Sequence, residues 1–331
     1  MSGTTTVGSE EFAHLIDPLR PELLAHCYRM LGSVHDAEDQ VQETLIRAWR
    51  SYADFEGRAS LRTWLYRIAT NTCLRALENR SRRPLPSGLG SPGEYPEEPL
   101  AQPGGDIPWL QPVPDELIGT HPADPASIVA ARSGVRLALI AALQYLPPRQ
   151  RAVLILRDVM RWRAAEVAEL LGTTTTAVNS MLQRARIQLS EAAPAADDIQ
   201  EPAGSQQRKL LDQYAAAFEN ADGAALTALL SRDAVFEMPP QPMWFAGRDQ
   251  IGRFVTAQVL RKPGEFKMIR VSANCQPGFA AYRRDRDGRY LAHGVQVLTV
   301  GVAGITHVVA FNQPELLAIF SLPPELPDDW D

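Results

Sequence analysis

A long segment in the first half of the chain limits its fold more than any other feature. Proline and glycine crowd residues 84–126, which also carry seven acidic side chains and neither lysine nor arginine. Proline removes a backbone donor and glycine costs conformational entropy, so this composition does not support a long helix. It also lacks the alternation of a strand. We therefore interpret residues 84–126 as an acidic linker between separate domains.

One part of this linker is unusually apolar. The run WLQPVPDELI at residues 109–118 carries five large apolar side chains, at positions 109, 110, 113, 117 and 118. An isolated apolar cluster in polar surroundings usually docks on another surface. We expect it to dock either on another part of this chain or on a partner.

Length and composition are those of a globular chain with two or three domains, since 45% of the 331 residues are apolar and 22% are charged. The first residues lack the basic and apolar regions of a signal peptide, and no stretch approaches the roughly 18 apolar residues that span a bilayer. We predict a cytoplasmic protein without membrane association. The three cysteines, Cys27, Cys73 and Cys275, lack metal-ligand spacing and are expected to be free thiols.

The net charge of −6 is unevenly distributed along the chain. Residues 12–83 carry 11 arginines against 9 acidic residues, a net of +2, and residues 127–193 carry 9 arginines against 4, a net of +5. Both of these segments are therefore basic, as contact with phosphates requires, and much of the acidic total lies in the connecting segments.

Residues 163–189 have the pattern of a helix-turn-helix. Gly172 permits a sharp turn, and Thr173 or Thr174 can cap the second helix. Five residues are expected on the inner faces of the two helices: Val167, Ala168, Leu171, Val178 and Leu182. The exposed face would then present Thr175, Thr176, Asn179, Ser180, Gln183 and Arg184 to the major groove of DNA. The alternative is an ordinary helical hairpin. Further helices are expected near 127–145 and 148–159.

The first basic segment, residues 12–83, is predicted to be an all-helical module. Apolar residues recur at spacings of three and four residues from Val34 to Tyr52, after a cap at Ser33 or Asp36. This spacing places Trp49 on the inner face of the helix. A second helix is expected from Leu61 to Arg83, with arginines on its outer sides. The chain from about residue 206 begins with another helix and then changes period. Its runs at 266–275, 278–285, 290–300 and 304–312 are typical of antiparallel strands.

Together these blocks resemble a group 4, extracytoplasmic-function (ECF) RNA polymerase sigma factor of the sigma-70 family. The first module is similar to sigma region 2 in DAEDQVQETLIRAWRSY and SLRTWLYRIATNTCLRALENRSRR, and the second to region 4 in LQYLPPRQRAVLILRDVMRWRAAEVAELLGTTTTAVNSMLQRARIQL. The remainder resembles the SnoaL-like, NTF2-type cone. The implied fold is multidomain, with two all-α modules and an α+β cone. The domain bounds are 12–83 for region 2, 84–126 for the linker, 127–193 for region 4 and 206–326 for the cone.

The resemblance implies core RNA polymerase and promoter DNA as partners, with no cofactor and no metal. In this family the acidic helix of region 2 binds the β′ clamp, which assigns that contact to Asp39, Gln40 and Glu43, and the β flap is a further polymerase contact. A solvated helix face is the alternative. The −10 element would be read by the loop 53–60 and by Arg62, Trp64, Arg67, Asn71 and Arg75, although Trp64 could equally be core. Arg80, Arg82 and Arg83 are expected to hold phosphates.

Region 4 would read the −35 element. The implied contacts are Thr175, Thr176, Asn179, Ser180, Arg184 and Arg186. The family commonly has lysine or arginine at the position of Asn179 and arginine at the position of Met181. We therefore expect weaker or differently specified −35 binding.

The cone implies a pocket, for which the candidate lining residues are Phe218, Trp244, Phe254, Tyr282, His293 and Phe311. These side chains could instead fill a core. His293 and His307 are candidates for acid–base chemistry, but the sequence pairs neither with a carboxylate, and no nucleophile motif or phosphate-binding glycine loop occurs. We expect that this chain is not an enzyme. The resemblance implies that this extension regulates the sigma modules in cis, with a small-molecule ligand as an open question. The alternatives are a helix-turn-helix regulator independent of polymerase and a pocket enzyme fused to a DNA-binding module.

Overall fold

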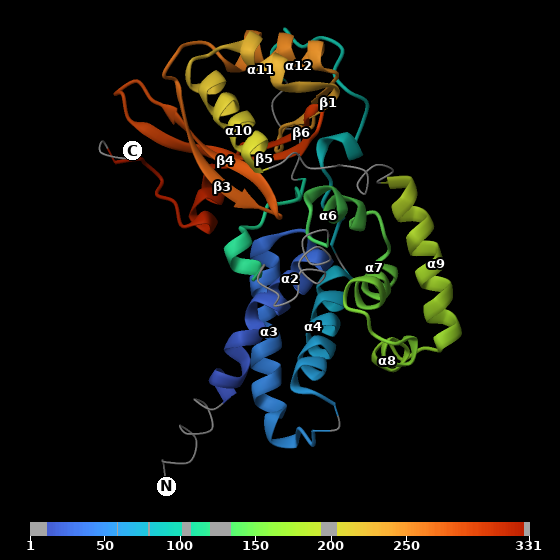
Figure 1. Ribbon diagram of the computed structural model, residues 1–331. Helices are drawn as coiled ribbons and strands as arrows, with labels where there is room; N and C mark the ends of the chain where they lie inside the picture. Colours follow the sequence, from blue (N-terminus) through green and yellow to red (C-terminus); the bar gives the residue numbers. More distant parts are fainter. Residues whose placement is uncertain are drawn as a thin grey trace. The chain divides into compact units, whose positions relative to one another are not determined.

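Helices α2 (Arg20–Leu31), α3 (Val34–Ser51) and α4 (Leu61–Leu77) form the first part of a helical unit (Figure 1). The computed structural model describes residues 12–57, 59–78, 80–100, 107–119, 134–192 and 204–327. Ser33 caps α3, because its hydroxyl accepts the backbone N–H of Asp36 at 3.2 Å. This selects one of the two predicted caps.

Helix α4 ends at Leu77, six residues before the predicted end at Arg83. The residue before a proline is disfavoured in helical geometry, and Pro84 follows Arg83 directly. Arg80 and Arg83 instead bind the carboxylate of Asp36 on α3. These ion pairs hold the segment after α4 against the start of α3.

The same unit contains α6 (Leu137–Leu143), α7 (Pro148–Leu154), α8 (Ala164–Leu170) and α9 (Thr175–Ala192). Helix α7 continues into a π turn at Ile155–Val159, close to its predicted end. The helix predicted near 127–145 begins at Leu137, and residues 127–133 lie outside the described part of the chain. Short 3-10 turns at Asp17–Leu19 and Asp115–Ile118 also belong to this unit.

The second unit is built on a six-stranded sheet. Its strands are β1 (Leu230–Glu237), β2 (Trp244–Ala246), β3 (Phe266–Ala273), β4 (Gln276–Arg284), β5 (Tyr290–Gly301) and β6 (Gly304–Phe311). The order across the sheet is β2-β1-β6-β5-β4-β3. The sequence predicted β3 to β6 but neither β1 nor β2. The pairing of β1 with β6 is parallel, so the expectation of antiparallel strands holds for the other pairs only.

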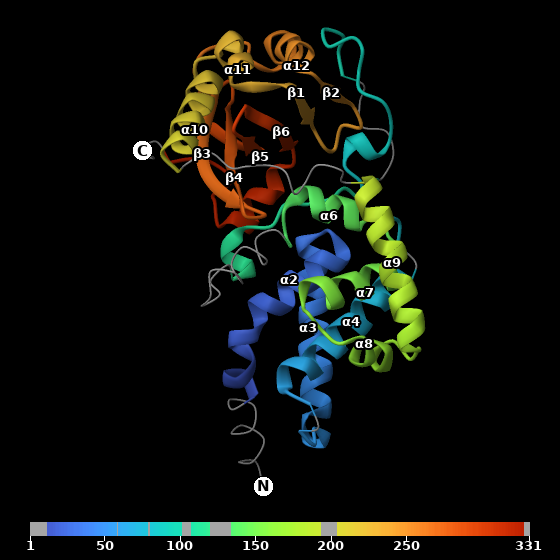
Figure 2. The same ribbon diagram turned by 45° about the vertical axis from the view of Figure 1, so that its right-hand side comes forward.

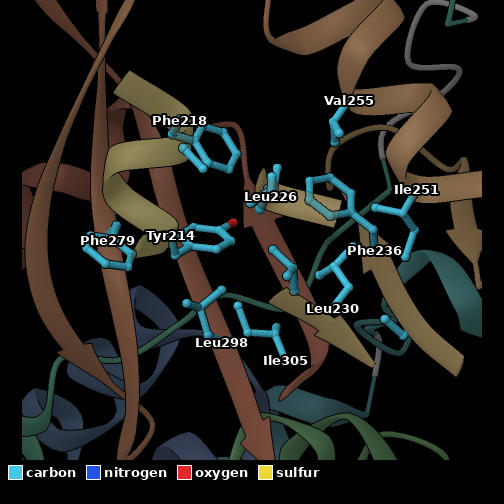
Figure 3. Close-up of a cluster of buried hydrophobic side chains, with 14 of the residues drawn as sticks. Tyr214, Phe218, Leu226, Leu230, Phe236, Ile251, Val255, Phe279, Leu298 and Ile305 are labelled. Atoms are coloured by element: carbon cyan, nitrogen blue, oxygen red, sulfur yellow. The ribbon is translucent and has the colours of Figure 1, made fainter. Parts of the chain in front are cut away.

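Helices α10 (Gly204–Glu219), α11 (Gly223–Leu229) and α12 (Arg248–Phe254) pack on one face of this sheet (Figure 2). The core between them is rich in aromatic side chains (Figure 3). Tyr214 and Phe218 of α10 contact each other with ring centroids 5.0 Å apart, and Tyr214 stacks on Phe279 of β4 at 5.5 Å. Such pairs add to the free energy gained by burying the rings. The described residues contain no helix long and apolar enough to cross a membrane.

Residues 84–100 and 107–114, which the sequence predicted to be part of a linker, belong to this second unit. Gly93 donates its N–H to the carbonyl of Trp244 at 2.7 Å, and the indole of Trp244 donates to the carbonyl of Gly90 at 2.9 Å. A Cβ on Gly93 would lie 2.8 Å from the Phe245 ring, so glycine is needed for this close approach to β2. The first part of the predicted linker is therefore packed structure.

Candidate functional site

The helix-turn-helix has the geometry that the sequence predicted. Thr174 caps α9, because its hydroxyl accepts the N–H of Ala177 at 3.1 Å, and Gly172 adopts a φ of 59° between the helices. All five predicted inner residues are buried: Val167, Ala168, Leu171, Val178 and Leu182. The predicted outer residues are all exposed: Thr175, Thr176, Asn179, Ser180, Gln183 and Arg184. Helix α9 therefore presents a polar face with one arginine near its middle.

The two candidate arginines of α9 have different surroundings. Arg184 forms no ion pair with any described residue. Arg186 is bound to both carboxylate oxygens of Asp158, at 2.7 and 2.9 Å, where the π turn after α7 passes beside it. Arg184 is therefore the freer cation for a phosphate, whereas Arg186 would first have to leave or share Asp158.

The arginine-rich helix α4 carries the other DNA candidates. Asn71 and Arg75 are exposed, and Arg75 has no ion pair with the described residues. Arg62 donates to Glu22 of α2 at 2.7 Å. Trp64 is half-buried and lies 4.8 Å from the ring of Phe55, so it is neither fully core nor fully free. Phe55 lies in the loop 53–60 that was predicted to read the −10 element, and its ring forms an aromatic pair with Trp64.

One candidate DNA contact on α4 is engaged by the helix-turn-helix. Arg67 forms an ion pair with Glu169 of α8 at 2.9 Å. Next to it, Tyr66 of α4 meets Trp162, which precedes α8, edge to face with ring centroids 6.4 Å apart. The two helical modules therefore contact each other through a surface that was predicted to read DNA.

A buried arginine joins the same two modules more deeply. Arg151 of α7 is 3% exposed and donates to the carbonyl of Met30 on α2, as well as to Gln144 and Leu146. Burial lowers the pKa of Arg151 to about 10. Carbonyl oxygens accept all of these hydrogen bonds, Nε of Arg151 has no hydrogen-bond partner among the described residues, and no sequence pattern marked this charge.

The three arginines after α4 are also engaged. Arg83 binds Asp36 at 2.6 Å and Arg80 binds the same carboxylate. Burial favours a raised pKa for Asp36, but the hydrogen bonds and charges of these two arginines outweigh it and lower the pKa below its usual value. Arg82 lies over the ring of Tyr145 at 4.8 Å. Their predicted role at phosphates stays a prediction.

The acidic side of α3 carries the candidate polymerase contacts. Asp39 is exposed, while Gln40 and Glu43 are half-buried. Glu43 accepts from Arg47 at 2.5 Å, one turn along the helix. Two large apolar side chains of α3 are also exposed, Ile46 by 46% and Trp49 by 39%. Trp49 was expected on the inner face. It contacts Phe12 at the edge of the core instead, so apolar surface adjoins the acidic positions.

The second unit contains a cavity of about 270 Å³ between α10, α12 and the sheet. Three of the six predicted lining residues border it: Phe218, Phe254 and His293. The other three lie elsewhere. Trp244 faces residues 90–93, Tyr282 donates to the carbonyl of Pro323 at 2.8 Å, and Phe311 is fully buried on β6 beside a cavity-lining neighbour, Ala310. Successive strand residues point to opposite faces, and a register shift between Ala281 and Tyr282 obscures the alternation in the sequence.

His293 and His307 have different environments. Burial lowers the pKa of His293, and the positive charge of Arg283 lowers it further. His307 lies outside the cavity and contacts the fully buried carboxylate of Glu237, Nε2 to Oε1, at 2.7 Å. The other oxygen of Glu237 accepts the backbone N–H of Ser87 at 2.7 Å. This histidine–carboxylate pair, which the sequence did not reveal, anchors the start of the 84–114 segment.

The apolar run WLQPVPDELI docks within the chain. Leu110 and Val113, which belong to the second unit, are fully buried. Asn274 accepts the N–H of Val113 at 3.1 Å through Oδ1 and donates its own N–H to the Val113 carbonyl at 2.9 Å. The last residues of the run, from Asp115, belong to the helical unit, where Ile118 is buried. The run is therefore shared between the two units.

Comparison with known proteins agrees with this architecture. The family model for sigma-70 region 2 matches residues 15–83, that for sigma-70 region 4 matches 136–189, and that for the SnoaL-like domain matches 211–307. The ECF RNA polymerase sigma factor SigG of Mycobacterium tuberculosis (strain ATCC 25618 / H37Rv) is 50% identical over 318 residues, which cover 96% of this chain and 85% of that protein. SigJ of the same strain is 29% identical over 76% of this chain and 74% of that protein.

A solved structure shares the fold. The crystal structure of the extracytoplasmic function sigma factor SigJ from M. tuberculosis matches with a TM-score of 0.61 and 23% identity, and the match covers 94% of this chain and 99% of that chain. Two sigma modules with a helix-turn-helix, followed by a SnoaL-like cone, define a sigma-70-type initiation factor. The chain belongs to the ECF RNA polymerase sigma factors. Its function is to bind core RNA polymerase and to direct promoter recognition.

Proposed function

We propose that this sigma factor is restrained in cis by its own C-terminal cone, which acts through the segment that joins region 2 to region 4. The observation that carries the proposal is the docking of residues 84–100 and 107–114 on the cone. Ser87 is bound to Glu237 at one end of the segment, and Val113 is bound to Asn274 at the other. Between them, Glu97 forms a bidentate ion pair with Arg253 at 2.6 and 2.9 Å. The described residues of this segment are thus attached to the cone at several points.

The contacts inside the helical unit support the need for such control. The −10 and −35 elements are named for positions about 25 base pairs apart, roughly 85 Å of B-form DNA at 3.4 Å per base pair. In the helical unit, Arg67 of the −10 helix is 2.9 Å from Glu169 of the helix-turn-helix. Both elements cannot be read in this arrangement. The modules must separate on the promoter, and the docked segment limits the chain available for that separation.

The residue assignments form part of the proposal. Asp39, Gln40 and Glu43 would face the β′ clamp, and Ile46 would extend that surface. Arg75, Asn71 and Trp64 would act at the −10 element, with Arg62 and Arg67 joining after they release their carboxylates. The polar face of α9 would read the −35 element. We place the chain in the cytoplasm, where core polymerase works, and assign no reaction to the cone, because the relatives are named as sigma factors.

Run-off transcription with core polymerase tests the proposal. The full chain is compared with residues 1–200, and the full chain is expected to be less active because it retains the cone. Since truncation also removes Glu237 and Asn274, the partners of Ser87 and Val113, a point variant is needed. Arg253→Gln loosens the segment at Glu97 and should raise run-off transcription. Arg248→Gln is the matched control, because Arg248 lies exposed on the same helix without a partner among the described residues. Equal activity of all four proteins would contradict restraint in cis.

A further inference from the structure

The cavity of the cone has an apolar interior. Phe218, Phe236, Phe254 and Phe266 line it together with Met238 and Val259. Its volume of about 270 Å³ lies just below the range of roughly 300–1,000 Å³ that is typical of sites for drug-sized molecules. The aromatic walls favour flat apolar groups, which gain from edge and face contacts with the rings. A ligand with one or two rings, or a short hydrocarbon chain, fits this interior.

Polar groups are concentrated on one side of the cavity. Gln296 borders it, and its Oε1 accepts the hydroxyl of Tyr214 at 2.7 Å, so the Nε2 donor is left for a ligand. Asn312 also lines the cavity and offers a second amide. His293 is kept neutral near pH 7, because burial and the charge of Arg283 lower its pKa. These groups supply hydrogen bonds without negative charge.

The charged side chains that border the cavity are all cationic. Arg261 and Arg283 line it, and no aspartate or glutamate does so among the described residues. Arg283 is already bound to Glu265 at 2.6 Å. Arg261 is exposed and has neither an ion pair nor a side-chain hydrogen bond with the described part of the chain. An anionic group at this rim would find a cation that is free to bind it.

The docked connecting segment also borders the cavity. Pro99 and Leu100 are part of its wall, and Leu100 packs against the core. Gln258, another lining residue, donates to the carbonyls of Glu97 at 2.7 Å and of Glu98 at 2.8 Å. A ligand in the cavity would therefore touch the segment and the residue that holds it.

We propose that the cone binds a small apolar carboxylic acid. The hydrocarbon part of this ligand fills the phenylalanine-lined cavity, and its carboxylate binds Arg261. Its presence changes how strongly the cone binds residues 97–100. The regulatory part rests on the proposed restraint in cis. Ligand binding is a property of the cone and can be tested independently of transcription.

Calorimetric titration of the full chain tests the ligand class. The probes are 2-naphthoate and the neutral 2-naphthylmethanol, which share one ring system. Wild-type protein should bind the carboxylate at least tenfold more tightly than the alcohol. Arg261→Gln should weaken 2-naphthoate about tenfold and leave the alcohol unchanged. Lys262→Gln is the matched control, since Lys262 is the exposed neighbour that does not line the cavity. Absence of binding, equal binding of both probes, or equal effects of the two variants would overturn the assignment.

Hydrogen exchange of the full chain tests the link to the segment. Saturating 2-naphthoate should change the exchange rate of amides in residues 90–100 several-fold in wild type, and less in Arg261→Gln at the same probe concentration. Binding without such a change would overturn the role of residues 97–100. If 2-naphthoate does not bind but Arg253→Gln still raises transcription, the ligand inference fails and restraint in cis stands. If it binds and the full chain, residues 1–200, Arg253→Gln and Arg248→Gln are equally active, restraint in cis fails.

Discussion

Individual arginines of this sigma factor differ mainly in whether a carboxylate already holds them. Arg75 and Arg184 have no ion pair among the described residues, whereas Arg62, Arg67, Arg83 and Arg186 all do. An arginine without an ion pair can contact a phosphate without first breaking an ion pair. The sequence could assign all of them to basic faces through helical periodicity, but it could not show which were neutralised by residues distant along the chain.

Arg184→Ala should therefore weaken promoter binding more than Arg186→Ala does. Loss of one phosphate contact is expected to lower the slope of log affinity against log salt by about 1. Because Arg186 is shared with Asp158, its removal should change the slope by less. Fluorescence anisotropy with promoter DNA at several salt concentrations measures both slopes. An unchanged slope for Arg184→Ala would remove this residue from the phosphate contacts.

His26 on α2 makes the stability of the helical unit depend on pH. It is fully buried, and its Nε2 lies 3.0 Å from the hydroxyl of Thr70. Burial, aided by the charge of Arg29, lowers the pKa of His26 from 6.5 to about 3. Between pH 6.5 and about pH 3, His26 therefore binds a proton in the unfolded chain but not in the folded chain. The stabilisation is complete above pH 6.5 and is lost as the pH falls towards 3.

In the wild type, the free energy of unfolding should fall by roughly 1.4 kcal/mol for each pH unit below 6.5 through His26 alone. His26→Gln should remove this contribution, so that the difference between the two proteins shrinks or reverses as the medium is acidified from pH 7 to 5. Urea unfolding at several pH values measures it. Parallel stability curves for the two proteins would show that His26 does not titrate in this way.

At the scale of elements, the structure agrees best with the sequence where one helix face is buried and the other is free. The caps of α3 and α9 and the inner face of α9 were predictable because local periodicity and one hydroxyl determine them, whereas Trp49 of α3 departs from its predicted face. The end of α4 was not, since Asp36 holds Arg80 and Arg83 from another helix. Strand β1 follows α11 directly and β2 has only three residues, so neither has a clear alternation. Half of the predicted lining residues lie away from the cavity, because strand register decides which side chains face inward.

The contact between α4 and α8 is also a matter of elements, and it predicts a gain of function. Glu169→Gln breaks the pair with Arg67 without altering a DNA-reading side chain. An exposed pair of this kind is worth about 0.2–1 kcal/mol, so run-off transcription should rise by no more than about fivefold. Glu166→Gln removes the same charge from the same helix, but Glu166 pairs with Arg163 inside its own module. A rise in both variants would indicate a general charge effect instead of release of Arg67.

At the scale of the whole molecule, the segment between the two sigma modules belongs to the same unit as the cone, and we propose that it links promoter reading to the cone. A proline-rich, acidic composition predicts a connector, and its apolar run predicts docking, but composition does not say on which surface. In the structure, backbone N–H groups of the segment donate hydrogen bonds to Trp244, Glu237 and Asn274. These partners lie more than a hundred residues away in sequence, so no local pattern could identify them.

Leu110→Ala tests this link without touching a charge or a module surface. Leu110 belongs to the second unit and is fully buried, and truncating such a leucine costs about 2–5 kcal/mol. Because the loss weakens the packing of the segment that carries Leu110, hydrogen exchange should rise in residues 107–114 and at the end of β3, which pairs with this segment. If the docked segment restrains the modules, the same variant should raise run-off transcription in the direction of Arg253→Gln. A destabilised cone with unchanged transcription would mean that the segment is attached to the cone only for stability, and that the signal which separates the modules acts elsewhere.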